Sequence, residues 1–450
     1  MSLNSERIQP FRALTFNRER VGGFDRVVAP PYDLIDQARQ DQLYARSPYN
    51  VVRLELNRET DPYSAAAETL AQWIDVHVVE PTGRPAICLY TQRFEVEGRH
   101  LIRSGLIARI RLEELSTGRI LPHERTFPKA KEDRLRLLTA TRTNVSPIFG
   151  LYPSGDTALE ALIIKVATRA PMIEVTDDLG IANEVRAIND VEEIAIVQRA
   201  LADARVLIAD GHHRYETALE YSRRRRAEQD NPSGLRGYDY VMMTLVAFDD
   251  PGLVILPTHR LVRRLPAEAI ASFEERAGEV FDVSEVGSID ALIEAVAENG
   301  RGTIGVALKG DQRLRALRLR NREAIAAAMP DLPIAVRELD VSILHALILD
   351  RIFGIKPDEI RKGGNIEYTI AARGAIAEVA AGAADGAFLM AAPTVHDVER
   401  VCNTGATMPE KSTYFFPKLL TGLVMNPLDD DGGTNGARVG DDEASTTEKP

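Results

Sequence analysis

Hydrophobic and polar residues along the chain follow two periods, one typical of amphipathic helices and one typical of strands. The helical period predicts helices near residues 34–46, 61–78, 131–142, 155–169, 190–202 and 212–229. Apolar runs predict strands near residues 51–56, 86–95, 100–111, 146–152, 170–175, 205–209 and 239–248. Glu97-Gly98 separates two of these strands and suits a hairpin turn. The pattern predicts a mixed α/β (α+β) fold.

The pattern changes after Pro251-Gly252, where short helices and strands begin to alternate. A chain of 450 residues exceeds the size of most single cores, so we expect more than one domain. We predict a main α/β domain at 1–250, a smaller α+β accessory domain at 251–397 and a return segment at 398–427 that packs on the main domain. The first ten residues and the acidic tail 428–450 are predicted to be disordered.

Composition limits the partners of the chain. The formal net charge is -12, which disfavours nucleic-acid binding and, with it, a nuclease function. No window approaches the ~20 apolar residues of a membrane span, and the N-terminus resembles no signal peptide, so we expect a cytoplasmic location. Cys88 and Cys402 lie in no metal-type spacing and are expected to be small buried hydrophobes. The oligomeric state is left open.

The strongest chemical candidate is the run from Val206 to Leu219, VLIADGHHRYETAL. It predicts a strand, a tight turn and a helix N-terminus, where free N–H groups, a glycine and cationic side chains favour a phosphate. Asp210 adds a carboxylate that could hold a metal ion or accept a proton. Alternatively, Asp210 is only a helix N-cap and Arg214 only its ion-pair partner. The candidate phosphate ligands are Gly211, His212, His213 and Arg214, and we expect one histidine to face the ligand while the other packs or is solvated.

A second candidate is the segment GATMPEKST, residues 405–413. It has the spacing of a phosphate-binding P-loop, but Glu410 replaces the second glycine and Pro409 removes an N–H donor, so we reject a P-loop. Lys411, Ser412 and Thr413 suit a phosphate as well as they suit a solvated loop.

Four further polar groups could complete a site. His123 and Glu124 could form a general-base pair or a metal ligand set, or a surface turn paired with Arg125 or Arg134. Arg134 is the cation of the following helix that we retain for a substrate anion. Asp33 follows two prolines and is either an N-cap or, with Tyr32, part of a pocket edge. His259 and Arg260 could add to an anion pocket.

Four motifs resemble a known family. They are APPYD (29–33), HERT (123–126), ADGHHRYETA (209–218) and MPEKSTYFFPK (408–418). They resemble a family of microbial proteins catalogued as domain of unknown function family ten-fifteen, a resemblance that covers nearly the whole chain but implies no activity. Locally, the DGHHR turn is similar to the phosphate-binding turn of the ParB and sulfiredoxin superfamily, which includes a free serine kinase. This second resemblance implies a ParB/sulfiredoxin-like nucleotide-binding core. Sulfiredoxins carry a cysteine in this turn where the present chain has histidine, which argues against sulfinic-acid repair.

Together these features predict a phosphotransferase that acts on a small hydroxyl compound such as serine, with ATP, ADP or pyrophosphate as donor. Residues 211–214 would hold the transferred group, magnesium would lie at Asp210 and Glu124, and Glu124 or Asp33 would accept the hydroxyl proton. Lys411 would stabilise the developing charge. The alternative is a non-catalytic regulator that binds a nucleotide or another phosphate metabolite.

Overall fold

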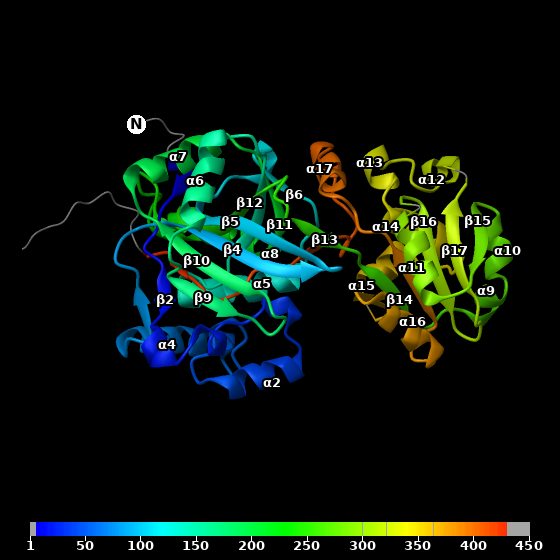
Figure 1. Cartoon of the computed structure of the whole chain (residues 1–450), viewed down its shortest axis with the longest axis horizontal. Helices are drawn as coiled ribbons and strands as arrows, with labels where there is room; N and C mark the ends of the chain where they lie inside the picture. The colour runs from blue at the N-terminus through cyan, green and yellow to red at the C-terminus, as the bar shows by residue number, and fades with distance from the viewer. Residues whose placement is uncertain (1–5, 299, 321, 363, 430–450) are drawn as a thin grey trace, which may run out of the picture.

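The computed structural model describes residues 6–298, 300–320, 322–362 and 364–429. Two lobes lie side by side, each built around its own sheet (Figure 1). We call them the large-sheet lobe, which carries a nine-stranded sheet, and the small-sheet lobe, which carries a six-stranded sheet.

The nine-stranded sheet has the order β6-β11-β8-β12-β5-β4-β10-β9, with β1 paired to β5. Strand β11 is parallel to β6 and β12 is parallel to β8, whereas the other neighbours are antiparallel. The predicted mixed α/β fold is therefore confirmed. The strands are β1 (Ile8–Gln9), β4 (Ile87–Val96), β5 (Arg99–Arg111), β6 (Ile120–Pro122), β8 (Ile148–Tyr152), β9 (Ile173–Thr176), β10 (Ala182–Ile188), β11 (Val206–Asp210) and β12 (Tyr240–Ala247).

Helices of the large-sheet lobe begin and end within a few residues of the predicted bounds. They are α2 (Gln37–Arg46), α4 (Pro62–Asp75), α5 (Pro128–Thr141), α6 (Thr157–Ala167), α7 (Val191–Leu201) and α8 (His212–Glu228). The predicted hairpin joins β4 to β5, because Glu97 and Gly98 have φ values of 52 and 74°, and Val96 pairs with Arg99. Positive φ at both turn residues matches the right-handed twist of the two strands.

Three local predictions are wrong. Residues 51–56, expected as a strand, contain helix α3 (Val52–Glu55), whose first turn is fixed by a 3.0 Å hydrogen bond from the Val52 N–H to Asn50 Oδ1. The first ten residues are not entirely disordered, because Ile8 pairs with Ile110 in the sheet. Leu428, placed in the predicted tail, is buried. Residues 430–450, the rest of that tail, lie outside the described residues.

The small-sheet lobe has the strand order β15-β17-β16-β19-β14-β18. Its strands are β14 (His259–Val262), β15 (Phe281–Val286), β16 (Thr303–Leu308), β17 (Leu314–Leu319), β18 (Ile366–Thr369) and β19 (Gly386–Met390). Its helices are α9 (Ala267–Ala271), α10 (Phe273–Gly278), α11 (Ile289–Glu298), α12 (Arg322–Ala328), α13 (Ile334–Arg337), α14 (Asp340–Ile343), a π-helix (Leu344–Asp350), α15 (Pro357–Lys362) and α16 (Ala372–Ala380). Helix α17 (Val395–Asn403) hydrogen-bonds with both lobes, through Arg400 to Glu338 and through Asn403 to Arg205.

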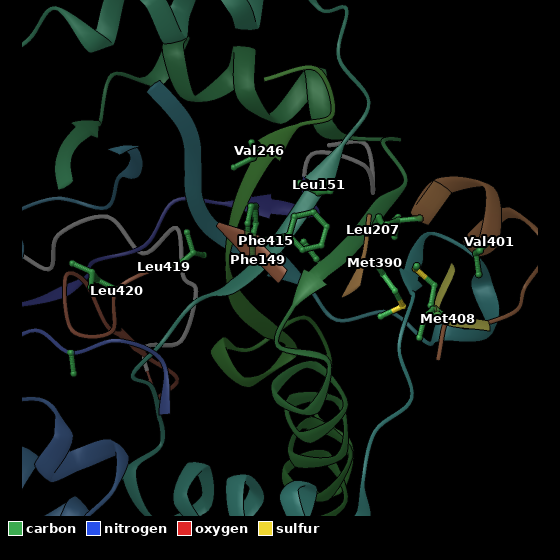
Figure 2. Close-up of a cluster of buried hydrophobic side chains, with 14 of the residues drawn as sticks. Phe149, Leu151, Leu207, Val246, Met390, Val401, Met408, Phe415, Leu419 and Leu420 are labelled. Atoms are coloured by element: carbon green, nitrogen blue, oxygen red, sulfur yellow. The ribbon is translucent and has the colours of Figure 1, made fainter. Parts of the chain in front are cut away.

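The chain returns from the small-sheet lobe to the large one after α17. Strand β20 (Tyr414–Phe416) pairs with β13 (Val254–Leu256), and β21 (Asn426–Pro427) pairs with β7 (Thr143–Asn144). Phe415 packs edge-on against Phe149, with the ring centroids 5.6 Å apart (Figure 2).

Buried polar side chains of the β4–β5 hairpin hold the backbone that follows β20. Arg103 is almost fully buried and donates to the carbonyl groups of Phe416 and Pro417, and Gln92 donates to the Lys418 carbonyl at 3.2 Å. Buried hydrogen bonds of this kind are costly to lose, so they fix the course of residues 416–418. Lys418 is thereby positioned from the main sheet.

Small elements complete the large-sheet lobe. They are α1 (Arg18–Val21), β2 (Leu14–Phe16) and β3 (Val79–Pro81). No helix among the described residues combines the length and the apolar character that a membrane crossing requires. Cys88 and Cys402 are free and buried.

Candidate functional site

The turn between β11 and α8 forms the centre of the candidate site. Its apolar strand is buried, and Gly211 takes the left-handed conformation with φ 92°. Gly211, not Asp210, occupies the N-cap position, and no side chain caps the 17-residue helix. The interpretation of Asp210 as a simple N-cap is therefore wrong. The first-turn N–H groups of α8 are left for an anion, as expected for a phosphate site.

Arg214 folds back over this turn instead of pointing freely into a pocket. Its Nη2 donates to Asp210 Oδ2 at 3.0 Å, and its Nη1 donates to the Pro147 carbonyl. A Cβ added at Gly211 would lie 2.9 Å from Arg214 Nε, so the guanidinium packs directly against the glycine. Among the described residues the buried Nε has no hydrogen-bond partner. Arg214 thus braces the turn with two of its nitrogens.

Lys418 supplies a second cation to Asp210. Its Nζ lies 3.2 Å from Asp210 Oδ1 and 4.7 Å from the centre of the Tyr414 ring. Burial would raise the pKa of Asp210, but Lys418 and Arg214 outweigh burial and lower it, so the carboxylate stays charged. Lys418 lies in the motif of residues 408–418, but it is not among the site residues that the sequence predicts. Only the motif signalled its importance, because its partner is remote in sequence.

His123 and His212 form a buried pair behind the turn. Their rings meet edge-on with centroids 4.6 Å apart, and the His123 N–H donates to His212 Nε2 at 3.3 Å. Burial lowers the pKa of both imidazoles, most strongly that of His212. Neutral His123 donates from Nδ1 to the Ile208 carbonyl at 2.7 Å, so its Nε2 accepts from the Thr413 hydroxyl at 2.9 Å.

His213 holds the same segment from the other side. Its Nε2 accepts the Phe127 N–H at 2.9 Å, and its ring stacks on Phe127. Burial is the largest influence on His213 and lowers its pKa. The two neutral histidines of the turn, His212 and His213, therefore hold residues 123–127 by accepting backbone N–H groups. The expectation that their side chains neutralise a phosphate is corrected accordingly, although their backbone N–H groups still lie in the first turn of α8.

Glu124 links residues 123–127 to Lys411. Its Oε1 accepts the Lys411 N–H at 3.1 Å, and Lys411 has a positive φ of 53°. The Lys411 side chain is exposed and forms no ion pair with the residues that the structure describes. A loop conformation that few non-glycine residues adopt thus presents a cation beside Glu124.

The neighbouring hydroxyl groups are already hydrogen-bonded within the protein. Ser412 donates to the Pro409 carbonyl, and Thr413 contacts His123 as described. Strand β20, not a helix, follows this segment, which agrees with the rejection of a P-loop. The hydroxyl groups of Ser412 and Thr413 therefore stabilise the loop, and Lys411 is the residue of this loop that can bind an anionic ligand.

Asp33 and Arg134 differ from expectation in their local roles. Asp33 is exposed in a short 3₁₀ helix, and Asp36 caps α2 by accepting the Arg39 N–H at 2.7 Å, so the N-cap interpretation of Asp33 is wrong. Arg134 is buried, lies 3.3 Å from Glu55 Oε1 and covers the Tyr32 ring at 4.3 Å. Its donors are occupied, so Arg134 supports Tyr32 instead of meeting a substrate anion.

Direct contacts bring these segments together, because Thr413 hydrogen-bonds to His123, Lys411 to Glu124 and Lys418 to Asp210. Burial raises the pKa of the Tyr414 hydroxyl, Asp33 and Asp210 raise it further, and Lys411 lowers it. The hydrogen bond between Thr413 and His123, whose ring contacts that of His212, places residues 411–413 next to the start of α8.

His259 and Arg260 lie outside this region as buried supports. His259 Nδ1 accepts the Met390 N–H at 3.3 Å. Arg260 is fully buried, and its Nη2 donates to the Lys411 carbonyl at 3.0 Å. Burial lowers the pKa of Arg260 to about 10. Arg260 therefore connects the small-sheet lobe to the Lys411 loop. It also lines a separate cavity of about 250 Å³ together with Arg301, so its part in an anion pocket stays a prediction.

The magnesium site expected at Asp210 and Glu124 does not fit this arrangement. Each Asp210 oxygen contacts a cationic nitrogen, and Glu124 Oε1 accepts a backbone N–H. Among the described residues, no group of three or more His, Cys, Asp and Glu could hold a metal ion. We therefore derive no step through a protein-bound metal.

Comparison with known proteins identifies the family. The model of a family described as "Protein of unknown function (DUF1015)" matches residues 8–342. The chain belongs to this family. The family predicted from the four motifs is thus confirmed. No curated protein matches the chain significantly.

Solved structures show only distant similarity. A conserved hypothetical protein from Pyrococcus furiosus is 14% identical with a TM-score of 0.33, over 70% of this chain and 92% of that one. A free serine kinase in complex with AMP is 15% identical with a TM-score of 0.34, over 69% and 86%. SbnI with a C-terminal truncation, from Staphylococcus aureus, is 11% identical with a TM-score of 0.32, over 70% and 85%. Scores this low carry no argument about ligand or activity, and the ParB/sulfiredoxin-like core stays a prediction.

Proposed function

We propose that this site binds a phosphate-bearing small molecule at the start of α8 and transfers a phosphoryl group to a small hydroxyl compound. The observation that carries the proposal is the uncapped N-terminus of α8, with Lys418 and Arg214 both paired to Asp210 beside it. An uncapped helix start flanked by cations favours an anion through N–H donors and through the helix dipole.

Each charged group has a distinct role in binding. First-turn N–H groups of α8 bind the phosphate oxygens, and Gly211 lets them approach closely. Asp210 acts as an anchor, because it holds Lys418 and Arg214 beside the helix start. Lys411, whose ammonium is exposed, binds the phosphate from the facing loop.

The transfer step requires an acceptor for one proton. The hydroxyl oxygen of the acceptor forms a bond to phosphorus while the bond from phosphorus to the donor oxygen breaks. The hydroxyl proton passes to the carboxylate of Glu124, and Lys411 stabilises charge on the departing oxygen. Asp33 is the second candidate for this base, because its charge, like that of Lys411, influences the pKa of the Tyr414 hydroxyl.

The direct test is turnover of a metabolite pool, followed by mass spectrometry, with ATP, ADP or pyrophosphate as alternative donors. Each donor is tested with magnesium and with EDTA, so that a metal bridging the phosphates is an experimental variable. Formation of a phosphorylated hydroxyl compound such as phosphoserine supports the proposal, provided that Lys411→Ala lowers the turnover and Lys165→Ala leaves it unchanged. Lys165 is a suitable control because it is exposed and pairs with Glu193 on another face. Absence of turnover with every donor contradicts it.

A non-catalytic regulator remains the second candidate, because one observation favours it. Asp210 has both oxygens paired with cations, so it is not available as a base. A regulator would bind ADP or pyrophosphate with normal affinity, yet show no turnover in the assay above. Calorimetry and mass spectrometry on the same sample separate the two functions.

A further inference from the structure

A cavity lies where the small-sheet lobe meets residues 407–410. Its volume is about 310 Å³, and its walls come from the helices between α12 and α15 together with Met408 and Arg125. Met408 is buried and lies near Val401 of α17 (Figure 2). A cavity of this size accommodates a small organic molecule.

Two of the residues that line it, Ser342 and His345, each have a buried polar atom that lacks a partner among the described residues. Ser342 is 2% exposed, and neither its Oγ nor the buried Nε2 of His345 forms a hydrogen bond with any residue that the structure describes. The two residues are three positions apart, so their side chains lie on the same helical face. They span the junction of α14 and the π-helix, and π-helical turns occur often at functional sites. Buried polar atoms normally have partners, so this pair is suited to a ligand.

The remaining wall defines the rest of the ligand. Most of the lining residues are apolar, among them Met329, Leu332, Val336, Ile360 and Met408. Burial and, to a smaller extent, the charge of nearby Arg260 lower the pKa of His345 to about 3, so the imidazole is neutral near pH 7. The charged lining residues are Arg125, which is exposed, Asp350, which pairs with Lys356, and Glu410. A neutral hydrogen-bonding pair in an apolar wall selects an uncharged polar group.

We propose that this cavity binds a small uncharged organic molecule with an apolar body and one hydroxyl or carbonyl group, held by Ser342 and His345. The proposal does not depend on phosphoryl transfer, since none of the residues assigned to that step lines the cavity. Glu410 lines it and directly precedes Lys411, so the two sites are adjacent along the chain.

The test uses the full chain labelled with ¹³C-methyl methionine, because Met329 and Met408 both line the cavity. The two resonances are assigned with Met329→Leu and Met408→Leu. Benzyl alcohol is the probe, toluene lacks its hydroxyl group, and benzoate carries a charge. Benzyl alcohol is expected to produce saturable shifts at both methyl groups, with toluene and benzoate binding at least fivefold more weakly. Absence of saturable shifts with benzyl alcohol, or equal affinity for toluene, overturns the proposal.

Variants separate the polar pair from the apolar wall. Ser342→Ala and His345→Leu are each expected to weaken benzyl alcohol binding at least threefold without weakening toluene binding. Ala346→Phe is expected to fill the cavity and abolish the shifts with both. Ser342→Ala removes only a hydroxyl group, so it keeps the test valid if His345→Leu fails to fold. Unchanged benzyl alcohol affinity in folded Ser342→Ala and His345→Leu contradicts the assignment.

Discussion

Lys418 Nζ lies 3.2 Å from Asp210 Oδ1, although 208 positions separate the two residues in the chain. The contact joins the return segment to the turn that precedes α8. Asp210, the last residue of β11, consequently contacts one cation from the helix that follows it, Arg214, and one that lies far away in the sequence, Lys418. This pairing is the structural basis of the first prediction.

Lys418→Met should weaken binding of pyrophosphate about tenfold or more, because a charge-assisted contact contributes ~1.5 to 3 kcal/mol. Isothermal titration calorimetry measures the change. Lys165→Met is the matched control, since it removes an exposed lysine that also pairs with one carboxylate. Equal pyrophosphate affinity in Lys418→Met and wild type would show that Lys418 serves the fold alone.

Gly211→Ala should destabilise the protein and disturb the anion site together. The left-handed backbone costs a non-glycine residue about 1–2 kcal/mol, and the added Cβ would lie 2.9 Å from Arg214 Nε. Urea unfolding gives the stability, and calorimetry with pyrophosphate gives the affinity. Gly83→Ala is the control, because a Cβ there meets nothing within 4 Å. The prediction fails if both variants behave alike.

Stability should fall as the pH decreases from about 6.5. The native pKa of His212 is well below 6.5, so the unfolded chain binds a proton first, and the stability present at neutral pH is lost on acidification. The loss is about 1.4 kcal/mol per pH unit for each such histidine. His212→Gln keeps an acceptor for the His123 N–H but cannot titrate, so its urea-derived stability should fall less steeply between pH 6.5 and 5. An unchanged slope would contradict a neutral, buried His212.

Glu124→Gln should reduce turnover roughly 10²-fold in any assay that detects transfer, because it removes the proposed base while keeping its shape. Asp33→Asn should have a smaller effect, since Asp33 is exposed and Glu124 is half-buried. Steady-state rates with a saturating donor provide the measurement. Full activity of Glu124→Gln with loss in Asp33→Asn would transfer the role to Asp33.

Arg214→Ala should affect both the stability of the protein and its affinity for the ligand. The Arg214 guanidinium donates to Asp210 and to the Pro147 carbonyl, so truncation should lower the free energy of unfolding as well as ligand affinity. Thermal melting checks this, with Arg224→Ala, which removes an exposed ion pair with Glu220, as control. A melting temperature equal to that of wild type would show that the contacts of Arg214 with Asp210 and Pro147 do not stabilise the protein.

Local features of the site were predictable from sequence, and long-range partners were not. The strand, turn and helix at residues 206–228 follow from an apolar run, Asp-Gly and a helical period, which are all local signals. In contrast, the roles of His212 and His213 depend on N–H groups of His123 and Phe127, more than 80 positions away. Spacing carries no information about such contacts.

The short run at residues 51–56 illustrates a different limit. Its apolar residues suit a buried strand and a buried helical turn equally well, because periodicity does not separate the two at this length. Asn50 decides the outcome, since its side chain accepts the Val52 N–H and donates to the Val28 carbonyl. That second contact depends on a remote segment, so only the folded chain reveals it.

Strand β20 and Lys418 are among the last parts of the described chain to leave the ribosome. Domains fold as units while synthesis proceeds, so most of the nine-stranded sheet can form while residues 414–418 are still enclosed. During that interval the α8 turn lacks one of the two cations on Asp210, and the Lys411 loop has no β20 to anchor it. A chain that stops at residue 410 would therefore retain the strands of the nine-stranded sheet but lack the ion pair of Asp210 with Lys418, so the site is complete only once residues 414–418 have been synthesised.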